Sequence, residues 1–368
     1  MRLTSIVRCT DLDEMTAFFV ENCRGLVESI TPADSPREVM IRIGEAQLCL
    51  QLADSDEPVS LIVTEPGRDV VETMTAANGT TIEFRPDRRT LDLPQSVPSL
   101  SIVRADDDFG VGRAGMHYRD LLPDRWGGRF IASHIVIPEG GPVPDYVHFH
   151  RVRFQLIFCA RGWVDVVYED QGEPFRLEAG DCVLQPPEIR HRVLASSSGM
   201  EVIEIGCPAE HDTFVEHDIT LPTASTRPDR TFGQQRFVRH VAADAPRRPW
   251  LIDGLHARDT GIGGATAGLG GAIVVEATGT SPSGENRSDV DTLTHHGEFV
   301  VSVVLAGSAA LIVGDDAPMH AGVADAVAFP PGTRWAWRDW SGDFEMLQVA
   351  LPDAAVVREP RVVGSITS

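Results

Sequence analysis

Two separated stretches of this chain share one pattern of apolar strand, glycine and paired prolines. Residues 153–162 and residues 300–307 each end an apolar run in a glycine. The segment 184–187, which reads LQPP, corresponds to 328–331, which reads AFPP. Degenerate self-similarity of this kind indicates a duplicated unit, and short strands separated by Gly, Pro and Asp turns are typical of all-β folds. We therefore expect two β barrels within one chain.

The first part of the sequence has a different texture. A helix is expected after Asp11, whose side chain suits an N-cap, and a second helix over 68–77, with short strands around both. The resulting β-α-β-β order resembles half of a vicinal-oxygen-chelate module. It carries no recognisable ligand set, so we expect a packing or dimerisation domain there. The predicted organisation is an α+β domain at 1–95, a metal-binding barrel at 96–217, a linker at 218–249, a degenerate barrel at 250–358 and a tail at 359–368.

Composition excludes several classes of function. Acidic residues outnumber basic ones 54 to 32, and the net charge of −22 argues against nucleic acid or an anionic membrane as partner. The chain has no lysine, which excludes Schiff-base chemistry and lysine-anchored pyridoxal phosphate. The six cysteines form no Cys-x-x-Cys pair, as expected for reduced thiols. With no signal-peptide pattern and no apolar run near the roughly 20 residues that span a bilayer, we expect a soluble cytoplasmic protein.

The first β region carries a set of metal-binding side chains. His148 and His150 are one residue apart, so on a strand they point to the same side. Gln155 follows shortly after, and His191 lies about forty residues further on. Three neutral imidazoles and one amide suit a divalent transition metal, whereas Mg²⁺ or Ca²⁺ sites are built from carboxylates. The sequence therefore predicts one transition-metal ion per chain, if the four side chains converge.

This region resembles the cupin superfamily. The first cupin motif has a glycine turn, His-x-His, an acid and a glycine, and its positions here are His148, His150, Gln155 and Gly162. The second motif has Gly, Pro-x-Gly and His, and its positions here are Gly180, Pro186, Glu188 and His191. Two residues depart from the family pattern: glutamine stands in place of the usual glutamate, and Glu188 in place of the turn glycine. The resemblance implies a double-stranded β-helix (jelly-roll) fold, mainly β overall, and metal binding by His148, His150, Gln155 and His191.

The second β region resembles a cupin that has lost its metal. Thr294 and His296 are placed at the paired-histidine positions, with Val300 at the acid position. Trp335 then replaces the histidine of the second motif. We expect Trp335, Trp337 and Trp340 to fill the emptied barrel or to lie in a subunit interface.

Other candidate site residues are less marked. Arg129 and Arg153 are candidates for binding a substrate carboxylate or enolate, with a surface salt bridge as the equal alternative for Arg129. Glu188 and Tyr146, and after them Asp145, are candidate acid or base groups, since an amide such as Gln155 cannot act as a base.

Two chemistries remain open for such a centre, which should favour an anionic, chelating substrate. One is an Fe(II) dioxygenase that cleaves a carbon–carbon bond of a small oxygenated or aromatic acid; three-histidine cupin dioxygenases, including the two-barrel gentisate class, resemble it. The other is a non-redox isomerase or tautomerase with a Lewis-acid metal, a class that the glutamine resembles. Fe(II) is the favoured metal, with Zn, Ni or Mn as alternatives. A non-catalytic small-molecule-binding cupin ranks last, and a homodimer is the expected assembly.

Overall fold

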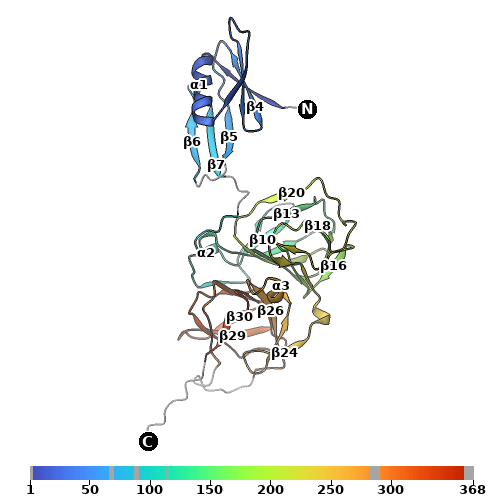
Figure 1. The fold of residues 1–368 in the computed structure, drawn as a ribbon. Coiled ribbons are helices and arrows are strands. Elements are labelled where there is room, and N and C mark those ends of the chain that lie inside the picture. Colours follow the sequence, from blue (N-terminus) through green and yellow to red (C-terminus); the bar gives the residue numbers. More distant parts are fainter. Residues whose placement is uncertain (1–2, 66–69, 87–90, 113–114, 282–290, 360–368) are drawn as a thin grey trace. The chain divides into compact units, whose positions relative to one another are not determined.

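The computed structural model describes residues 3–65, 70–86, 91–112, 115–281 and 291–359. It divides the chain into two compact units, 1–90 and 91–368 (Figure 1). Among the described helices, none has the length and apolar character needed to cross a membrane.

The first unit is a small α+β domain. Its four-stranded sheet has the order β1-β4-β3-β2 with β1 parallel to β4, and its three-stranded sheet has the order β5-β7-β6. Its elements are β1 (Thr4–Cys9), α1 (Leu12–Cys23), β2 (Leu26–Thr31), β3 (Glu38–Ile43), β4 (Ala46–Leu52), β5 (Ser60–Glu65), β6 (Glu72–Thr75) and β7 (Thr81–Pro86).

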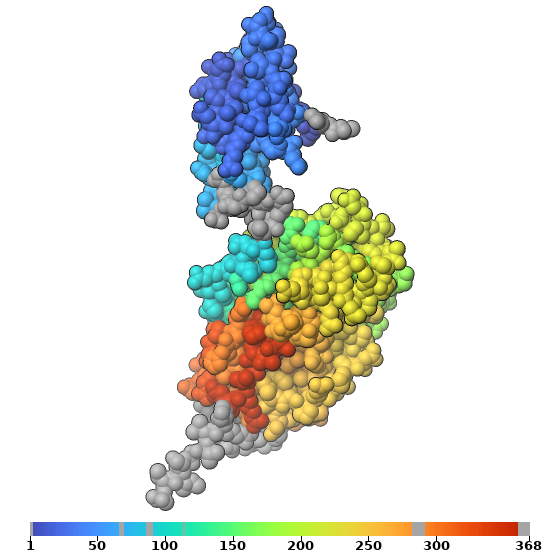
Figure 2. Space-filling view, viewed as in Figure 1, coloured from blue at the N-terminus to red at the C-terminus, as the bar shows by residue number. Residues whose placement is uncertain are grey.

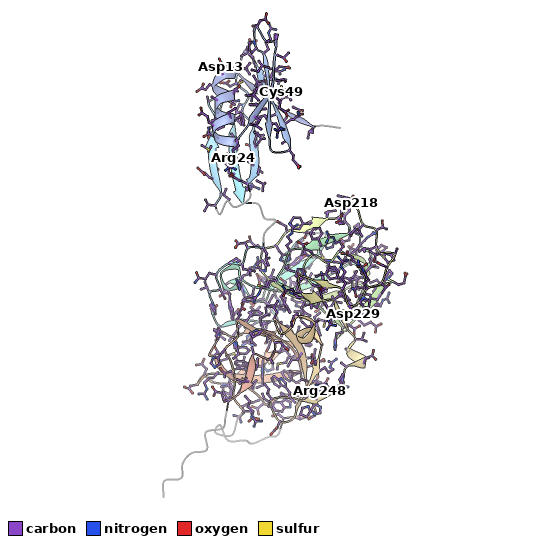
Figure 3. The ribbon with its side chains drawn as sticks, in the orientation of Figure 1. Asp13, Arg24, Cys49, Asp218, Asp229 and Arg248 are labelled. Carbon is purple, nitrogen blue, oxygen red and sulfur yellow. The ribbon has the colours of Figure 1, made fainter. Side chains whose placement is uncertain are left out.

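Helix α1 begins where the sequence predicts. The Asp11 side chain accepts a hydrogen bond from the Glu14 amide, and Asp13 lies in the first turn, where a negative charge complements the helix dipole. The helix ends at Arg24, which adopts a left-handed conformation; Asp13 and Arg24 mark its two ends in Figure 3. Phe19 is fully buried in the core that α1 forms with the sheet.

The second helix expected at 68–77 is a strand instead, and residues 68 and 69 lie outside the described part of the chain. Residues 72–75 form β6, which pairs antiparallel with β7. Met74 packs against the core while Thr73 and Thr75 face outward, so the burial alternates with the period of two that a strand requires. The two β-branched threonines favour that extended conformation.

The second unit contains two barrels, as the sequence predicts, so the mainly-β fold class is confirmed. In the first barrel a large sheet, β23-β17-β14-β19-β11-β10-β9, faces a smaller one, β16-β15-β18-β13-β20, with β12 paired to β18. The elements of this region are β9 (Gly110–Val111), β10 (His117–Asp120), α2 (Arg125–Gly128), β11 (Ile131–Ile137), β12 (Gly141–Pro142), β13 (His148–His150), β14 (Phe154–Arg161), β15 (Trp163–Tyr168), β16 (Phe175–Glu178), β17 (Cys182–Leu184), β18 (His191–Ser196), β19 (Met200–Cys207) and β20 (Thr213–Val215).

The second barrel repeats this arrangement. Its large sheet is β24-β25-β26-β33-β28-β31-β8 and its small sheet is β30-β29-β32-β27-β34. The elements are β8 (Ser101–Val103), β24 (Arg247–Pro249), β25 (Leu255–Asp259), α3 (Ile262–Ala265), β26 (Gly271–Ala277), β27 (Leu293–His295), β28 (Phe299–Ala306), β29 (Ser308–Val313), β30 (Met319–Gly322), β31 (Ala326–Ala328), β32 (Arg334–Arg338), β33 (Glu345–Leu351) and β34 (Val356–Arg358).

The barrels exchange strands, which the predicted boundaries at 96–217 and 250–358 do not anticipate. Strand β8 precedes the first barrel in sequence but pairs with β31 of the second. Strand β23 (Val238–His240) lies in the predicted linker 218–249 but pairs with β17 of the first barrel. That segment also holds the hairpin β21 (Thr231–Phe232) and β22 (Gln235–Arg236) and the short helix η2 (Ala242–Asp244). Asp218 and Asp229, labelled in Figure 3, bracket its proline-rich beginning.

The two large sheets share one core. Phe130 of the first barrel and Phe299 of the second stack with ring centroids 4.4 Å apart, and both rings are buried. The barrels form one continuous body in the space-filling view, green to yellow beside orange to red (Figure 2). Along β14, Phe154 and Leu156 belong to this shared core, whereas Ile157 packs inside the first barrel. Side chains alternate along a strand, so Gln155 faces the inside of the first barrel with Ile157.

Candidate metal centre

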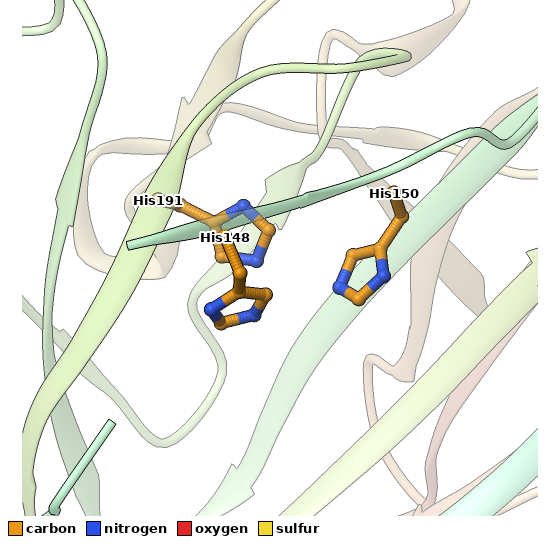
Figure 4. Close-up of side chains that lie close together, drawn as sticks. All are labelled: His148, His150 and His191. Carbon is orange, nitrogen blue, oxygen red and sulfur yellow. The ribbon is translucent and has the colours of Figure 1, made fainter. Parts of the chain in front are cut away.

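The three predicted histidines converge inside the first barrel (Figure 4). His148 and His150 lie on β13, and His148 pairs directly with His191 of β18. One ring nitrogen from each histidine lies within 4.8 Å of the other two. Two adjacent strands of one sheet therefore place three imidazoles around a common point, on backbone that the barrel holds rigid.

Each imidazole is oriented by a backbone carbonyl. The Nδ1 atoms of His148, His150 and His191 lie 2.8, 3.3 and 3.0 Å from the carbonyl oxygens of residues 146, 212 and 189. A carbonyl only accepts hydrogen bonds, so Nδ1 is the protonated nitrogen in each neutral ring and Nε2 carries the lone pair. Metal-binding histidines are oriented in this way by their second nitrogen, and the residues present therefore fit a transition-metal ion.

Burial keeps His191 neutral. Desolvation lowers the pKa of this imidazole well below its ordinary value of 6.5, and the neighbouring His148 and His150 lower it further. A neutral ring is the form that donates a lone pair to a metal.

The Nε2 atom of His191 has a hydrogen-bond partner that sequence reasoning missed. The side-chain amide of Gln185 lies 3.0 Å from this nitrogen, and the Tyr168 hydroxyl donates to the Gln185 oxygen at 3.2 Å. The Tyr168 ring stacks against His191, and all three side chains are buried. A metal bound at His191 Nε2 would take the place of the Gln185 hydrogen bond.

Gln155 lies on β14, beside Gln185. It pairs across strands with Gln185, whose backbone N–H donates to the Gln155 carbonyl at 2.9 Å. Its side chain is 3% exposed, and its Oε1 atom has no hydrogen-bond partner among the described residues. A buried acceptor without a partner is costly, and a cation is one group that would satisfy it.

Glu204 is a carboxylate inside the barrel that sequence reasoning did not select. It lies on β19 opposite Ile157, and its Oε1 accepts a hydrogen bond from Gln155 Nε2 at 2.7 Å. The signal was available, because a charged residue interrupts an apolar alternation over 200–207 at a position that shares its face with Val202.

The candidate acid and base groups from the sequence lie elsewhere. Glu188 forms an ion pair with Arg151 at 2.7 Å and its side chain is about half exposed. Its φ of 61° is the left-handed conformation for which the family uses glycine. Tyr146 is 67% exposed and meets the site only through its carbonyl. Asp145 lies 3.5 Å from His148 Nδ1 and accepts from the Val193 amide, so it supports the ring from behind.

The candidate substrate-binding arginines both contact the second barrel. Arg153 forms two hydrogen bonds to Glu298, at 2.8 and 2.7 Å, and Arg129 forms one to the same carboxylate at 3.2 Å. These ion pairs hold the pKa of Glu298 below its usual range. The structure thus places Arg129 and Arg153 together with Glu298, in the salt-bridge arrangement.

Among the described residues of the second barrel no histidine triad is found, and the strand register there corrects the sequence alignment. Leu293 pairs with Trp335 as His148 pairs with His191. The paired-histidine positions are therefore Leu293 and His295, not Thr294 and His296, while Val300 matches Gln155 as predicted. Trp335, Trp337 and Trp340 are buried in the core of this barrel, where Trp335 stacks on Phe329 with ring centroids 4.1 Å apart.

No protein-family model matches the sequence, and no curated protein matches it. Among solved structures, a salicylate 1,2-dioxygenase from Pseudaminobacter salicylatoxidans is 14% identical, with a TM-score of 0.50 over 72% of this chain and 87% of that one. An oxalate decarboxylase from Lactobacillus farciminis is 12% identical (TM-score 0.49, 73% and 89% covered), and protein Ylba from E. coli is 10% identical (TM-score 0.49, 72% and 94% covered).

The first of these likenesses shows the fold of this chain. The chain folds into two double-stranded β-helix barrels, and three histidines lie close together in the first of them. The predicted cupin resemblance is confirmed.

Proposed function

We propose that this protein is an Fe(II)-dependent cupin dioxygenase that cleaves a carbon–carbon bond in a small oxygenated or aromatic acid. The observation that carries the proposal is the triad, in which three neutral imidazoles converge with each Nδ1 tied to a carbonyl. A bound iron would act as a Lewis acid and would relay electrons from the substrate to dioxygen. The salicylate 1,2-dioxygenase of similar fold supports this choice of reaction.

The ligand set selects the charge of the substrate. Three imidazoles and the Gln155 amide are all uncharged, so they leave the full positive charge of a divalent ion at the site. An anionic substrate with two oxygen donors complements that charge.

Apolar side chains line the inside of the same barrel. Val166, Leu177 and Val202 line the interior, and Phe232 from the segment 218–249 packs there too. Such apolar walls strengthen electrostatic interactions within the barrel and protect reactive species.

A second candidate is a non-redox isomerase, and Glu204 is the observation that favours it. Proton transfer needs a base, and this carboxylate lies inside the barrel next to Gln155, whereas Glu188 and Tyr146 lie outside. In that case the same neutral ligand set would stabilise an enolate.

Oxygen consumption distinguishes the two candidates. Protein purified without oxygen and loaded with Fe²⁺, Mn²⁺, Ni²⁺ or Zn²⁺ is offered a panel of phenolic acids, α-keto acids and diketones in an oxygen electrode. We expect oxygen uptake equal to substrate loss with Fe²⁺ alone, and none in the His191→Ala variant. Turnover with Zn²⁺ or Ni²⁺ and no oxygen uptake would instead support the isomerase. No turnover with any metal on the panel would contradict both.

A further inference from the structure

Glu204 and Gln155 form an isolated polar pair on the inner wall of the first barrel. Residues 200 and 202 on β19 pack inside this barrel, whereas Ile203 and Ile205 lie in the core shared with the second. Glu204 therefore faces inward, between Ser133 of β11 and Ile157 of β14. Glu204 is partly buried, and its carboxylate accepts a hydrogen bond from the Gln155 amide.

The contact with Glu204 determines the orientation of the Gln155 amide. The two ends of a glutamine amide are similar in shape, and only hydrogen-bond partners distinguish them. An ionised carboxylate accepts and does not donate, so the NH₂ end must face Glu204, as it does at 2.7 Å. The carbonyl end, Oε1, is consequently directed away from Glu204 and is the buried atom without a partner among the described residues.

The position of Gln155 relates this orientation to the metal centre. Gln155 and Gln185 are cross-strand neighbours on the inner face, which brings their Cβ atoms within about 5.5 Å of each other. The Gln185 amide reaches His191 Nε2 at 3.0 Å. Gln155 thus lies beside a side chain that contacts the triad directly.

We propose that Glu204 is a positioning residue: it holds the Gln155 amide so that Oε1, rather than NH₂, is presented to the metal centre. This inference rests on the proposed function in that it needs a metal at the triad. Without Glu204 the amide can rotate and present two N–H donors, which repel a cation. With Glu204 the neutral glutamine acts as an oxygen ligand of fixed direction.

A purely structural role predicts different behaviour. If the pair only satisfies two buried polar groups, its disruption lowers the stability of the metal-free protein and leaves the affinity for metal unchanged. Metal affinity measured separately from stability therefore decides between the two roles.

The experiment uses Co²⁺ as the probe with the full chain. Co²⁺ is titrated into metal-free wild type, Glu204→Gln and Glu204→Leu, with the dissociation constant and the visible absorption of the bound ion as readouts. We expect the affinity to fall about tenfold or more in Glu204→Leu and the spectrum to shift, since loss of a group that orients a ligand costs roughly 10- to 100-fold in affinity. In Glu204→Gln the fall should be smaller, because the new amide can either accept from Gln155 or donate to it and so fixes its orientation less strictly. Thermal unfolding of the metal-free proteins is measured in parallel.

A charge exchange supplies the matched control. In Gln155→Glu alone, two carboxylates are brought into contact, and we expect a lower melting temperature of the metal-free protein. In the double variant Gln155→Glu with Glu204→Gln, the donor and acceptor are exchanged, so we expect the melting temperature and Co²⁺ binding to recover.

The outcomes separate this inference from the proposed function. Co²⁺ affinity and spectrum unchanged in Glu204→Gln and Glu204→Leu, with binding still lost in His191→Ala, would overturn the role of Glu204 and leave the metal centre intact. Failure of the double variant to recover would also overturn it. No Co²⁺ binding by the wild type would instead refute the metal centre itself.

Discussion

The two barrels share one backbone plan and differ at the inward positions of a few strands. The register equates three inward side chains of the first barrel with apolar ones in the second: His148 with Leu293, Gln155 with Val300, and His191 with Trp335. At the fourth position both barrels have a histidine, His150 and His295. The first barrel thus gathers polar groups around one point, and the second fills the same volume with stacked aromatic rings. Metal binding in this fold is therefore decided by a small number of side chains and not by the barrel itself.

His295 lies at the position that corresponds to His150, and its hydrogen-bond partner shows how the neighbours of a histidine determine which ring nitrogen is protonated. His295 is fully buried, and its Nε2 lies 2.7 Å from the carbonyl of Phe329. The nitrogen corresponding to a metal ligand in the first barrel is here the protonated donor. In the first barrel the carbonyl partners lie at Nδ1 instead, which leaves Nε2 for a metal.

The largest expected effect is on metal content. His191→Ala should reduce retained metal from one ion per chain to none, because it removes one of the three imidazoles that converge on the site. The measurement is elemental analysis of the purified variant. His295→Ala, the control from the second barrel, should keep one ion per chain. Full occupancy in His191→Ala would refute the assigned site.

The next largest effect is on the free energy of unfolding, and it concerns a substitution in the second barrel. Trp335→Ala should lower the free energy of unfolding by about 3–5 kcal/mol, since it removes a buried ring stacked on Phe329 and leaves a cavity. Metal content should stay at one ion per chain. Denaturant unfolding followed by tryptophan fluorescence measures the change. Loss of metal in this variant would show that the second barrel takes part in the site.

A smaller effect is expected at the turn before His191. Glu188 has a φ of 61°, and Gly332, at the matching turn of the second barrel, has a φ of 81°. Glu188→Gly relieves the left-handed strain and loses a half-exposed ion pair with Arg151, so the free energy of unfolding should rise by no more than about 1 kcal/mol. Turnover should be unchanged. A marked loss of activity at constant stability would make Glu188 a catalytic group after all.

The smallest expected effect is on how the free energy of unfolding depends on pH. Burial lowers the pKa of His295 in the folded protein, so in the range below about 6.5 the unfolded chain binds a proton that the folded chain does not. Stability is then lost as the pH falls through this range, by up to about 1.4 kcal/mol per pH unit. His295→Gln should reduce that slope in urea unfolding between pH 5.5 and 7.5. The slopes of variant and wild type should coincide above pH 7.5; an undiminished slope in the acid range would contradict the assignment.

The sequence predicted the triad because its signal is local. A His-x-His pair must point to one side of a strand, and the turn before the third histidine carries a recognisable proline. Helix α1 was predicted for the same reason, since Asp11 caps it within its own segment. The cupin pattern then brought the separate segments into one barrel.

What the sequence did not reveal depends on contacts between distant strands. Glu204 could not be related to Gln155 without knowing that β14 and β19 are neighbours. The same holds for Arg153, whose partner Glu298 lies in the other barrel. The sequence alignment placed Thr294 where the structure has Leu293. An error of one residue in the register is enough for this, because it reverses the face of every side chain on a strand. The prediction of a helix at 68–77 was wrong because it used local propensity alone, whereas residues 72–75 form a strand that pairs with β7.

The exchange of β8 and β23 has a consequence for any attempt to divide this molecule. Cutting the chain at the predicted end of the first barrel, after residue 217, would leave each half with an unpaired sheet edge and a strand that belongs to the other half. The two barrels should therefore melt as a single cooperative unit, and a ligand that binds only the first should raise the melting temperature of both. Because of this exchange, a metal ion bound in the first barrel should stabilise the second barrel as well.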